Sequence, residues 1–463
     1  MGAAVVAVIG AGASGALTAA AILRRAGADV AVRLIDAADS TGRGVAYGTV
    51  DRRHLTNVPV ARMSADPDAP DDFLHWLRRH RAPQVRVTDY VPRQWFGEYL
   101  EGHLARTAER SQARLYRIND EAHSIVPRGG RYRVRLRHGL SMMTDAVVLA
   151  VGAPRADAGL LPSALTASPL FCADPWNPVL LHRATDHADR ILFVGAGLTM
   201  VDLAISLDRP GRKLMAVSRT GLLPAAHARR PPSGILPPPV VPDGVLSRQA
   251  AERLIVEQVR RAQAEYGDWR PGIDSLRPVA DELWQRLSVI DQRRFARGEG
   301  LREWEVRRHR MAPETAERLQ EMRDAGRFTV RRATIASARR HRNGGLRVLL
   351  SDSTRLHAHA VVDCTGAGIP DAVRQGGNPL LADLVGRGLA RINDQGLGLD
   401  NDRGGALVSA DGRVQSALRV VGHYRRGPVW ETTAIPQIRL QAVQVAEDLL
   451  AARQPAPVPE RTR

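Results

Sequence analysis

The sequence predicts an α/β protein with two doubly wound domains, the second inserted in the first and carrying a helical insertion. Three observations predict it. A glycine motif near the N-terminus lies between an apolar strand pattern and an Ala/Leu-rich helix pattern. The same strand–glycine–helix order returns in the middle of the chain. Each copy is followed by two similar strand patterns joined by Gly-Gly, and a duplication of this kind indicates two parallel sheets.

The first glycine motif has the full context of a dinucleotide-binding turn. The apolar run Ala3–Ile9 predicts a buried strand, and the next strand ends in an acid 21 residues after the third glycine. This order provides a tight turn, a close approach of the backbone to a pyrophosphate, a helix N-terminus and an acid for the ribose hydroxyls. The Rossmann-like unit therefore predicts cofactor contacts from Gly10, Gly12, Ser14, Gly15 and Asp36.

The second motif differs from the first at two positions. Met200 replaces the third glycine, which predicts looser packing of the helix on the strand. The following strand ends in Ser-Arg-Thr instead of an acid, and an arginine there suits the 2′-phosphate of NADP. The alternative is a solvated arginine in an arginine-rich chain. The residues expected to bind NADPH are Gly195, Gly197, Thr199, Ser218, Arg219 and Thr220.

The repeated strands set the expected domain boundaries. Each copy ends in an apolar strand and a glycine, at Gly152 in the first copy and at Thr365-Gly366 in the second, where cofactors bind at a sheet edge. The second copy is longer, and its excess lies in a proline-rich loop and an Arg/Glu-rich helical pattern. We expect a first dinucleotide-binding domain built from 1–155 and 341–463, and a second domain over 185–340 with a helical insertion over 222–326.

Two dinucleotide sites in one chain indicate hydride transfer from NADPH, held by the second domain, to FAD, held by the first. The glycine-rich loop Gly42–Ser64 follows Asp36, and its Arg43 is suited to pair with the FAD pyrophosphate. Four further residues of the loop are expected beside the isoalloxazine ring: His54, Asn57, Met63 and Ser64. Loop scaffolding is the alternative for each of them, and His54 is as readily a structural histidine as a catalytic one.

A family resemblance is carried by five segments: Gly42–Leu77, Gly197–Gly211, Ser218–His227, Val306–Glu314 and Val429–Ala442. They resemble FAD/NAD(P)-binding proteins with two nucleotide domains, some of which are identified as FAD-dependent urate hydroxylases. More distantly, the layout is similar to flavin monooxygenases that hydroxylate amines or insert oxygen into ketones. Met200 departs from the small residue that many of those enzymes have at this position.

The resemblance also implies a role for the start of the C-terminal helix. This helix start would face the flavin pyrimidine, where the helix dipole stabilises negative charge on the reduced ring. A threonine before the helix is expected to cap it. The alternative is an ordinary capped helix that closes the first domain. The cofactor contacts expected here are Thr432, Thr433, Ala434 and Ile435.

The first functional hypothesis is an FAD-dependent, NADPH-consuming monooxygenase. It would hydroxylate a small nitrogen-bearing or acidic metabolite with O₂ through a C4a-hydroperoxyflavin. The alternatives are an NADPH-dependent flavin reductase that passes electrons to a partner protein or quinone, and a non-catalytic flavin-binding regulatory protein. No catalytic side chain stands out. The candidates to receive an acidic substrate, against the alternative of a solvated basic face, are His227, Arg229, Arg230, His309 and Arg310.

Composition argues against several other classes. The 463 residues are 44% apolar and 25% charged, which is typical of globular proteins. The net charge is +17, but one lysine against 65 arginines indicates a GC-rich genome more than a nucleic-acid partner. Cys172 and Cys364 lie far apart and belong to no metal or dithiol motif. Without a membrane span or signal peptide pattern we expect a cytoplasmic protein, and a homodimer stays open.

Overall fold

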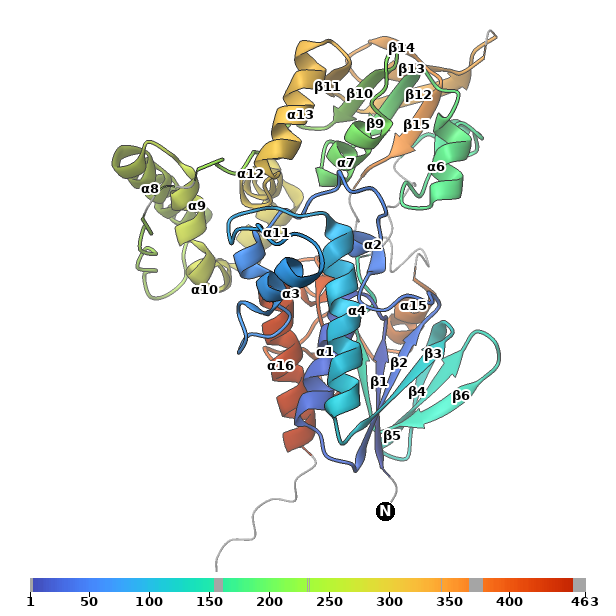
Figure 1. Ribbon diagram of the computed structural model, residues 1–463, viewed down its shortest axis with the longest axis vertical. Helices are drawn as coiled ribbons and strands as arrows, with labels where there is room; N and C mark the ends of the chain where they lie inside the picture. The colour runs from blue at the N-terminus through green and yellow to red at the C-terminus, as the bar shows by residue number, and fades with distance from the viewer. Residues whose placement is uncertain are drawn as a thin grey trace, which may run out of the picture.

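The computed structural model describes residues 3–153, 161–230, 232, 234–342, 344–365 and 378–452. Figure 1 shows two α/β domains, one above the other, with the helices α8 to α10 extending to one side of the contact between them. Strand β1 and the last helix, α16, belong to the same lower domain. The upper domain is therefore inserted in the lower one, and the α/β class is confirmed.

The first domain is built on a six-stranded sheet of order β16-β17-β7-β1-β2-β3, in which only the β16–β17 pair is antiparallel. Helices α1, α4 and α16 cover one face of this sheet (Figure 1). The elements are β1 (Ala4–Ile9), α1 (Ala13–Arg25), β2 (Val30–Asp36), α4 (Arg93–Arg110), β3 (Arg114–Asn119), β7 (Ala146–Leu149), β16 (Ala406–Val408), β17 (Val414–Val420) and α16 (Ile435–Ala451).

Strand β1 is apolar throughout because both faces of the sheet are covered. Val6 and Val8 pack under the helices, whereas Ala7 and Ile9 pack on the opposite face. A three-stranded antiparallel sheet and helix α15 cover that opposite face. Their bounds are β4 (Ala122–Arg128), β5 (Arg131–Leu136), β6 (Ser141–Thr144) and α15 (Pro379–Gly386).

The second domain repeats this plan with a five-stranded parallel sheet of order β11-β10-β9-β15-β8 and a three-stranded antiparallel sheet, β12-β13-β14. The predicted Gly-Gly turns are present in both copies, because Gly129, Gly130, Gly344 and Gly345 all have positive φ. The elements are β8 (Phe171–Cys172), α6 (Pro178–Thr185), β9 (Arg190–Val194), α7 (Leu198–Leu207), β10 (Lys213–Ser218), α13 (Pro313–Asp324), β11 (Phe328–Arg332), β12 (Ile335–Arg340), β13 (Leu346–Leu350), β14 (Arg355–Ala358) and β15 (Ala360–Asp363).

Strands β13 to β15 correct the expected domain boundary at 340/341. Strand β15 pairs in parallel with β9 in the centre of the second sheet, and β13 and β14 form its hairpin sheet. The second domain therefore extends to at least Asp363, and its expected start at 185 is too late because β8 pairs with β15. Each copy of the repeat has its own hairpin sheet and its own following strand. The hairpin sheet β12-β13-β14 and strand β15 are therefore part of the second domain and not of the first.

The helical insertion consists of α8 (Arg248–Tyr266), α9 (Arg270–Ser275), the 3₁₀ turn η3 (Arg277–Val279), α10 (Ala280–Arg286), α11 (Val289–Arg297) and α12 (Glu299–Arg308). It contacts the first domain through the stacked rings of Trp284 and Trp430, whose centroids lie 4.3 Å apart. The expected limit at 326 is too late, because α13 packs on α7 and β11 of the second domain.

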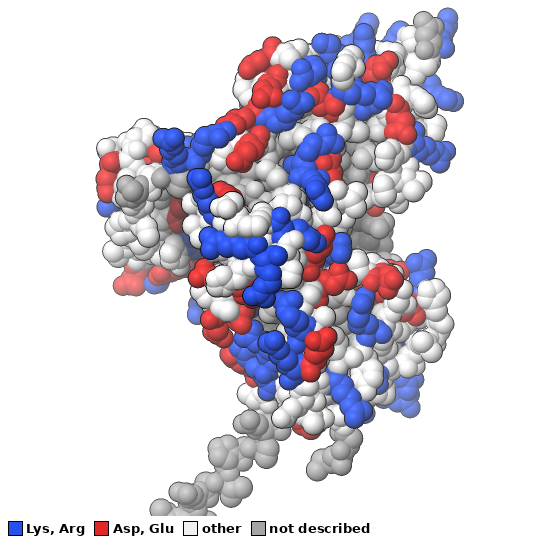
Figure 2. Space-filling view, viewed as in Figure 1, with Lys and Arg blue, Asp and Glu red and all other residues white. Residues whose placement is uncertain are grey.

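Short elements complete the chain: α2 (Gly44–Tyr47), η1 (Val60–Arg62), α3 (Asp72–His80), α5 (Ser163–Thr166) and η4 (His423–Arg425). On the face shown in Figure 2, basic side chains are interspersed with acidic ones. Among the described residues, no helix combines the length and the apolar character needed to cross a bilayer.

Candidate functional site

Two glycines of the first loop have no room for a side chain. Gly10 has a φ of +99°, and a Cβ there would lie 2.3 Å from the carbonyl oxygen of Ala150, just after β7. A Cβ on Gly15 would lie 1.8 Å from the carbonyl oxygen of Gly10. Gly12 differs, because the nearest atom to its Cβ position is the Cα of Gly44 at 3.5 Å. Gly12 is therefore the position at which a pyrophosphate can approach the backbone.

Polar groups surround this loop at the carboxyl edge of the sheet. Asp36, at the end of β2, accepts hydrogen bonds from the backbone N–H groups of Ala11 at 2.6 Å and Ala38 at 2.8 Å. Its carboxylate is thereby held against the glycine loop. The hydroxyl of the nearby Thr41 is buried and has no hydrogen-bond partner among the described residues. An orphaned hydroxyl at this place fits a polar cofactor.

Gly422 and His423 follow strand β17 at the same edge of the sheet, and they were not singled out from the sequence. A Cβ on Gly422 would lie 2.9 Å from the hydroxyl of Ser14 in the glycine loop. The Nε2 atom of His423 is buried without a partner in the described part of the chain, and burial lowers the pKa of this histidine to about 4. The signal available was the apolar run ending in glycine, which β17 shares with the strand that ends before Gly152.

The second glycine loop is held in a similar way up to its third position. A Cβ on Gly195 would lie 2.4 Å from the carbonyl oxygen of Cys364, just after β15. A Cβ on Gly197 would meet no described atom within 4 Å, so this residue leaves an open approach. Met200, at the third position, is fully buried in the core of the second domain. Helix α7 thus packs on its sheet through the large side chain of Met200, whereas α1 packs through the backbone of Gly15.

At the end of β10, beside this loop, one arginine has no hydrogen-bond or ion-pair partner among the described residues. Ser218 and Thr220 each accept a hydrogen bond from a backbone N–H of the turn that follows, at 3.0 and 3.3 Å. Arg219 between them is exposed and makes no hydrogen bond or ion pair with any described residue. Thr199 lies in the first turn of α7. The arrangement suits a 2′-phosphate at Arg219.

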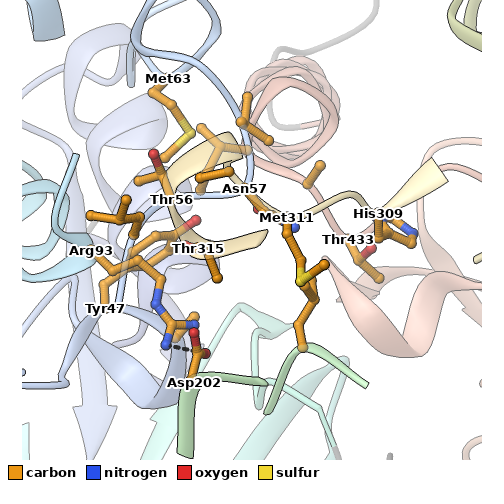
Figure 3. A pocket seen from close by; sticks show the side chains of 17 residues that line it. Tyr47, Thr56, Asn57, Met63, Arg93, Asp202, His309, Met311, Thr315 and Thr433 are labelled. Carbon is orange, nitrogen blue, oxygen red and sulfur yellow. Dashed lines mark hydrogen bonds and ion pairs between the residues drawn. The ribbon is translucent and has the colours of Figure 1, made fainter. Parts of the chain in front are cut away.

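A cavity of about 220 Å³ lies between the two domains and the segment that follows α12 (Figure 3). The first domain supplies one wall, α7 of the second domain supplies the floor, and the residues after α12 supply the opposite wall. The residues that line it are Ala46, Tyr47, Leu55, Thr56, Asn57, Val58, Met63, Arg93, Leu198, Asp202, His309, Met311, Ala312, Thr315, Thr433, Ala434 and Ile435. Asn57, Met63, His309, Thr433, Ala434 and Ile435 were singled out from the sequence.

Helix α16 begins at this cavity without a side-chain cap. Ala434 is its N-cap residue, so the expectation of a threonine cap is wrong. Thr432 instead donates a hydrogen bond to the carbonyl oxygen of Gly422 at 2.8 Å, which ties the segment to the end of β17. In the first turn Pro436 has no N–H, and the N–H of Gln437 donates to the carbonyl oxygen of Ala434 at 3.0 Å, so among the described residues the N–H of Ile435 is the one left for a ligand. The positive end of the helix dipole faces the cavity.

An ion pair across the domains closes the floor of the cavity. The guanidinium of Arg93 at the start of α4 lies 2.6 Å from the carboxylate of Asp202 in α7 (Figure 3). Burial raises the pKa of Asp202 to about 6, although the charge of Arg93 acts in the opposite direction. Asp202 lies in the segment Gly197–Gly211 and Arg93 in none of the segments singled out from the sequence, so only the fold shows that the two residues are partners.

His54 contacts the second domain instead of lining the cavity. Its Nδ1 lies 2.6 Å from the hydroxyl of Thr49, and its Nε2 lies 2.7 Å from the hydroxyl of Ser206 in α7. Burial, followed by the charge of Arg93, lowers its pKa to about 4. With both nitrogens occupied, His54 acts as a neutral structural link, and this placement does not support the expected flavin contact.

Other predicted residues lie near the site with their side chains occupied. Arg43 pairs with Glu101 at 2.9 Å, and Ser64 donates to the carbonyl oxygen of Ala69 at 2.6 Å. Thr365 donates to Asp363 at 2.6 Å and belongs to the second domain. Gly152, with a φ of +73°, follows β7. Gly366 lies outside the described residues. Their cofactor contacts stay predictions.

The candidates in the insertion are separated by the fold. His309 lines the cavity, whereas the Nε2 atom of His227 lies 3.0 Å from the carbonyl oxygen of Asn57. Arg229 forms an exposed ion pair with Glu317. Arg230 is exposed, and Arg310 is 1% exposed and bonded to Asp274.

The two nested domains and their paired glycine loops define a fold with two dinucleotide-binding domains. Residues 7–154 match the family model described as FAD-NAD(P)-binding, whereas no curated protein matches the sequence.

Among solved structures, the chain resembles the ornithine hydroxylase of Pseudomonas aeruginosa, with a TM-score of 0.61, 18% identity, and coverage of 97% of this chain and 99% of that one. It also resembles the L-lysine 6-monooxygenase of Pseudomonas syringae, with a TM-score of 0.60, 19% identity, and coverage of 97% and 99%. The ornithine N-hydroxylase of Kutzneria sp. 744 has a TM-score of 0.62, 14% identity, and coverage of 98% and 100%. These likenesses extend over whole chains and establish the fold.

Proposed function

We propose that the protein is an FAD-dependent, NADPH-consuming monooxygenase that hydroxylates a small nitrogen-bearing molecule. The observation that carries this proposal is the position of the cavity, which is lined by the loop after the first glycine motif, by the helix after the second motif and by the segment after α12. A flavin ring held in this cavity would be open to a hydride donor bound by the second domain. It would be open to a substrate from the side formed by the segment after α12. The resemblance to N-hydroxylating monooxygenases supports the reaction class by analogy of fold.

The residues of the first domain are suited to hold FAD, which when bound supplies the transfer of electrons from NADPH to O₂. Gly12 would admit the pyrophosphate, and Asp36 would accept the ribose hydroxyls. The uncapped start of α16 would face the pyrimidine edge, where its positive dipole end stabilises negative charge. The orphaned polar atoms of Thr41 and His423 would gain partners from the ligand.

The cavity lining limits the access of water to the reacting atoms. Leu55, Val58, Leu198 and Met311 contribute apolar surface, and the two charges on the floor satisfy each other. Exclusion of water matters because activated oxygen would otherwise be lost as hydrogen peroxide. His309 and Thr315 are the polar side chains that the described residues after α12 contribute to the cavity lining. Burial, followed by the charge of Arg308, lowers the pKa of His309 well below its usual range, so its neutral ring can bond a substrate amine.

The test starts from the purified protein with its bound flavin. Under anaerobic conditions NADPH is added and the bleaching of the flavin is followed. Oxygen is then added with one candidate amine at a time: ornithine, lysine or cadaverine. NADPH loss, hydrogen peroxide release and hydroxylated product are measured together. The Asp202→Asn variant breaks the charge balance at the cavity floor, and Asp71→Asn, at an exposed position, is its matched control.

We expect flavin reduction by NADPH, product formation with an amine, and a larger share of hydrogen peroxide in Asp202→Asn than in the control. NADPH oxidation that never yields a hydroxylated product from any amine, but that reduces a quinone, would assign the protein as a reductase. A flavin that NADPH cannot bleach would overturn the proposal altogether.

A further inference from the structure

A cluster of four arginines lies outside the cavity, where the helical insertion meets the first domain. Arg62 ends η1, Arg277 begins η3, Arg308 ends α12, and Arg310 follows two residues later. We refer to these four residues as the arginine cluster. The proposed reaction uses none of them.

The carboxylates around the arginine cluster do not balance its charge. Arg308 is neutralised by Glu431 in a buried bidentate pair at 3.0 and 2.6 Å. Arg277 and Arg310 share one carboxylate, that of Asp274, at 2.9 and 2.6 Å. Arg62 makes no side-chain hydrogen bond or ion pair with any described residue. Arg277 and Arg310 therefore share a single carboxylate, and Arg62 has no carboxylate partner among the described residues, so the carboxylates paired with these three arginines do not balance their charge.

The arginine cluster is largely buried and borders solvent at Arg277 and Asp274. Arg310 is 1% exposed, and its Nε and NH1 atoms have no hydrogen-bond partner in the described part of the chain. The side chain of Arg277 is 13% exposed and that of Asp274 is 41% exposed. Buried guanidinium donors without partners are costly, and an anion would satisfy them.

The pKa values of the cluster agree with this geometry. Burial, and after it the charge of Arg308, lowers the pKa of Arg277 to about 9. The same two causes lower the pKa of Arg62, and Arg310 adds to the effect. The arginines thus act on one another electrostatically, as neighbours in one positive site do.

The arginine cluster is separate from the cavity. His309 and Met311 line the cavity, and Arg310 lies between them in the chain. Its guanidinium lies 5.8 Å from the centre of the Trp269 ring and is bonded to Asp274, both in the insertion. The Arg310 guanidinium therefore contacts the insertion, whereas the two neighbours of Arg310 in the chain line the cavity.

We propose that Arg62, Arg277 and Arg310 form a binding site for an oxyanion, the phosphate or carboxylate group of a small molecule, at the contact between the first domain and the helical insertion. The planar fork of arginine matches such groups in a bidentate manner. An anion there would bridge η1 of one domain to η3 and the end of α12 in the other, so its binding would stabilise their contact. The proposal stands whether or not the protein is a monooxygenase.

The test measures anion binding and needs no turnover. The full-length protein is saturated with FAD and NADP⁺, so that the phosphate sites of both nucleotides are filled. Inorganic phosphate and acetate are then titrated at constant ionic strength, with calorimetry and thermal unfolding as readouts. The Arg62→Gln variant is compared with Arg260→Gln, an exposed arginine of α8 without an ion pair in the described chain. Arg62 is chosen because it bonds no other side chain, and Arg277→Gln serves if Arg62→Gln fails to fold.

We expect saturable binding with one anion per chain, a higher unfolding temperature in its presence, and at least tenfold weaker binding in Arg62→Gln but not in Arg260→Gln. Tighter binding of phosphate than of acetate would assign a phosphorylated ligand, and the reverse order a carboxylate. If neither anion binds saturably, or if the two variants behave alike, the arginine cluster is only a structural clamp and the proposal is wrong.

Discussion

The two glycine loops of this protein differ in how closely the helix packs against the strand that precedes it. In the first loop the third residue is Gly15, whose Cβ would lie 1.8 Å from a backbone oxygen. In the second loop the third residue is Met200, which is fully buried among apolar side chains. A loop built on bare backbone contact has no freedom to adjust, whereas one separated by a flexible methionine does. The difference suits a cofactor that stays bound in the first site and one that exchanges in the second.

The largest expected effect comes from adding one methyl group to each loop in turn. Gly15→Ala places a Cβ inside the van der Waals radius of the Gly10 carbonyl oxygen, so we expect loss of bound flavin. Gly197→Ala meets no described atom within 4 Å, and its change in unfolding free energy should stay within about 1 kcal/mol. Flavin absorbance per chain and the unfolding temperature check both. Stoichiometric flavin in Gly15→Ala would remove the basis of the comparison.

The next effect sharpens the role of the methionine. Met200→Ala removes a fully buried side chain from the core of the second domain, so the free energy of unfolding should fall by about 2–5 kcal/mol. The first domain does not use this residue, so flavin should remain bound under native conditions. Denaturant unfolding monitored by flavin release and by circular dichroism separates the two domains. A loss below about 1 kcal/mol would show that α7 can collapse onto the strand as α1 does.

A third prediction concerns the residues that close the second strand of each loop. Asp36 is bonded to its own glycine loop, whereas Arg219 is exposed without a partner in the described chain. Arg219→Ala should raise the KM for NADPH by roughly 10- to 100-fold, because a charge-assisted contact is worth about 1.5–3 kcal/mol. The KM for NADH should not change. Arg183→Ala, an exposed arginine of α6, is the control, and equal effects on both nucleotides would contradict a phosphate contact.

The sequence was sufficient for the features that a short stretch of chain encodes. The two βαβ units and the Gly-Gly turns follow from local patterns. Asn57, Met63 and Thr433, singled out as cofactor contacts, line the cavity, and their contacts with a cofactor stay predictions. The floor pair of Arg93 and Asp202 could not be predicted, because the two residues belong to different domains and neither local sequence marks the other residue as its partner.

Two expectations show where contacts between the domains go beyond local sequence patterns. The boundary at 340/341 was wrong because an apolar strand carries no mark of the sheet it joins, and β15 pairs with β9. His54 was expected at the flavin because of its loop, but its partner is Ser206 of α7, in the other domain. Contacts between domains depend on the tertiary structure, and the hydrophobic periodicity of a sequence does not predict them.

The smallest predicted effect tests this contact between the domains through pH. The pKa of His54 is lowered to about 4, against about 6.5 in the unfolded chain, so the unfolded chain binds more protons between these values. The contribution of His54 to stability is therefore present above pH 6.5 and is lost as the pH falls towards 4. Between pH 7.5 and 5 this amounts to about 1–2 kcal/mol.

The Asp202 carboxyl acts in the opposite sense, because its raised pKa makes the folded state bind more protons between about pH 4 and 6. His54→Gln can keep a hydrogen bond to Ser206 but cannot titrate, whereas Asp202 is present in both proteins. The difference between the two urea unfolding curves at pH 7.5 and at pH 5 thus isolates the histidine. The wild type should lose more stability on acidification than His54→Gln. Parallel losses would mean that His54 is already solvated, and that the two domains are not held together at this point.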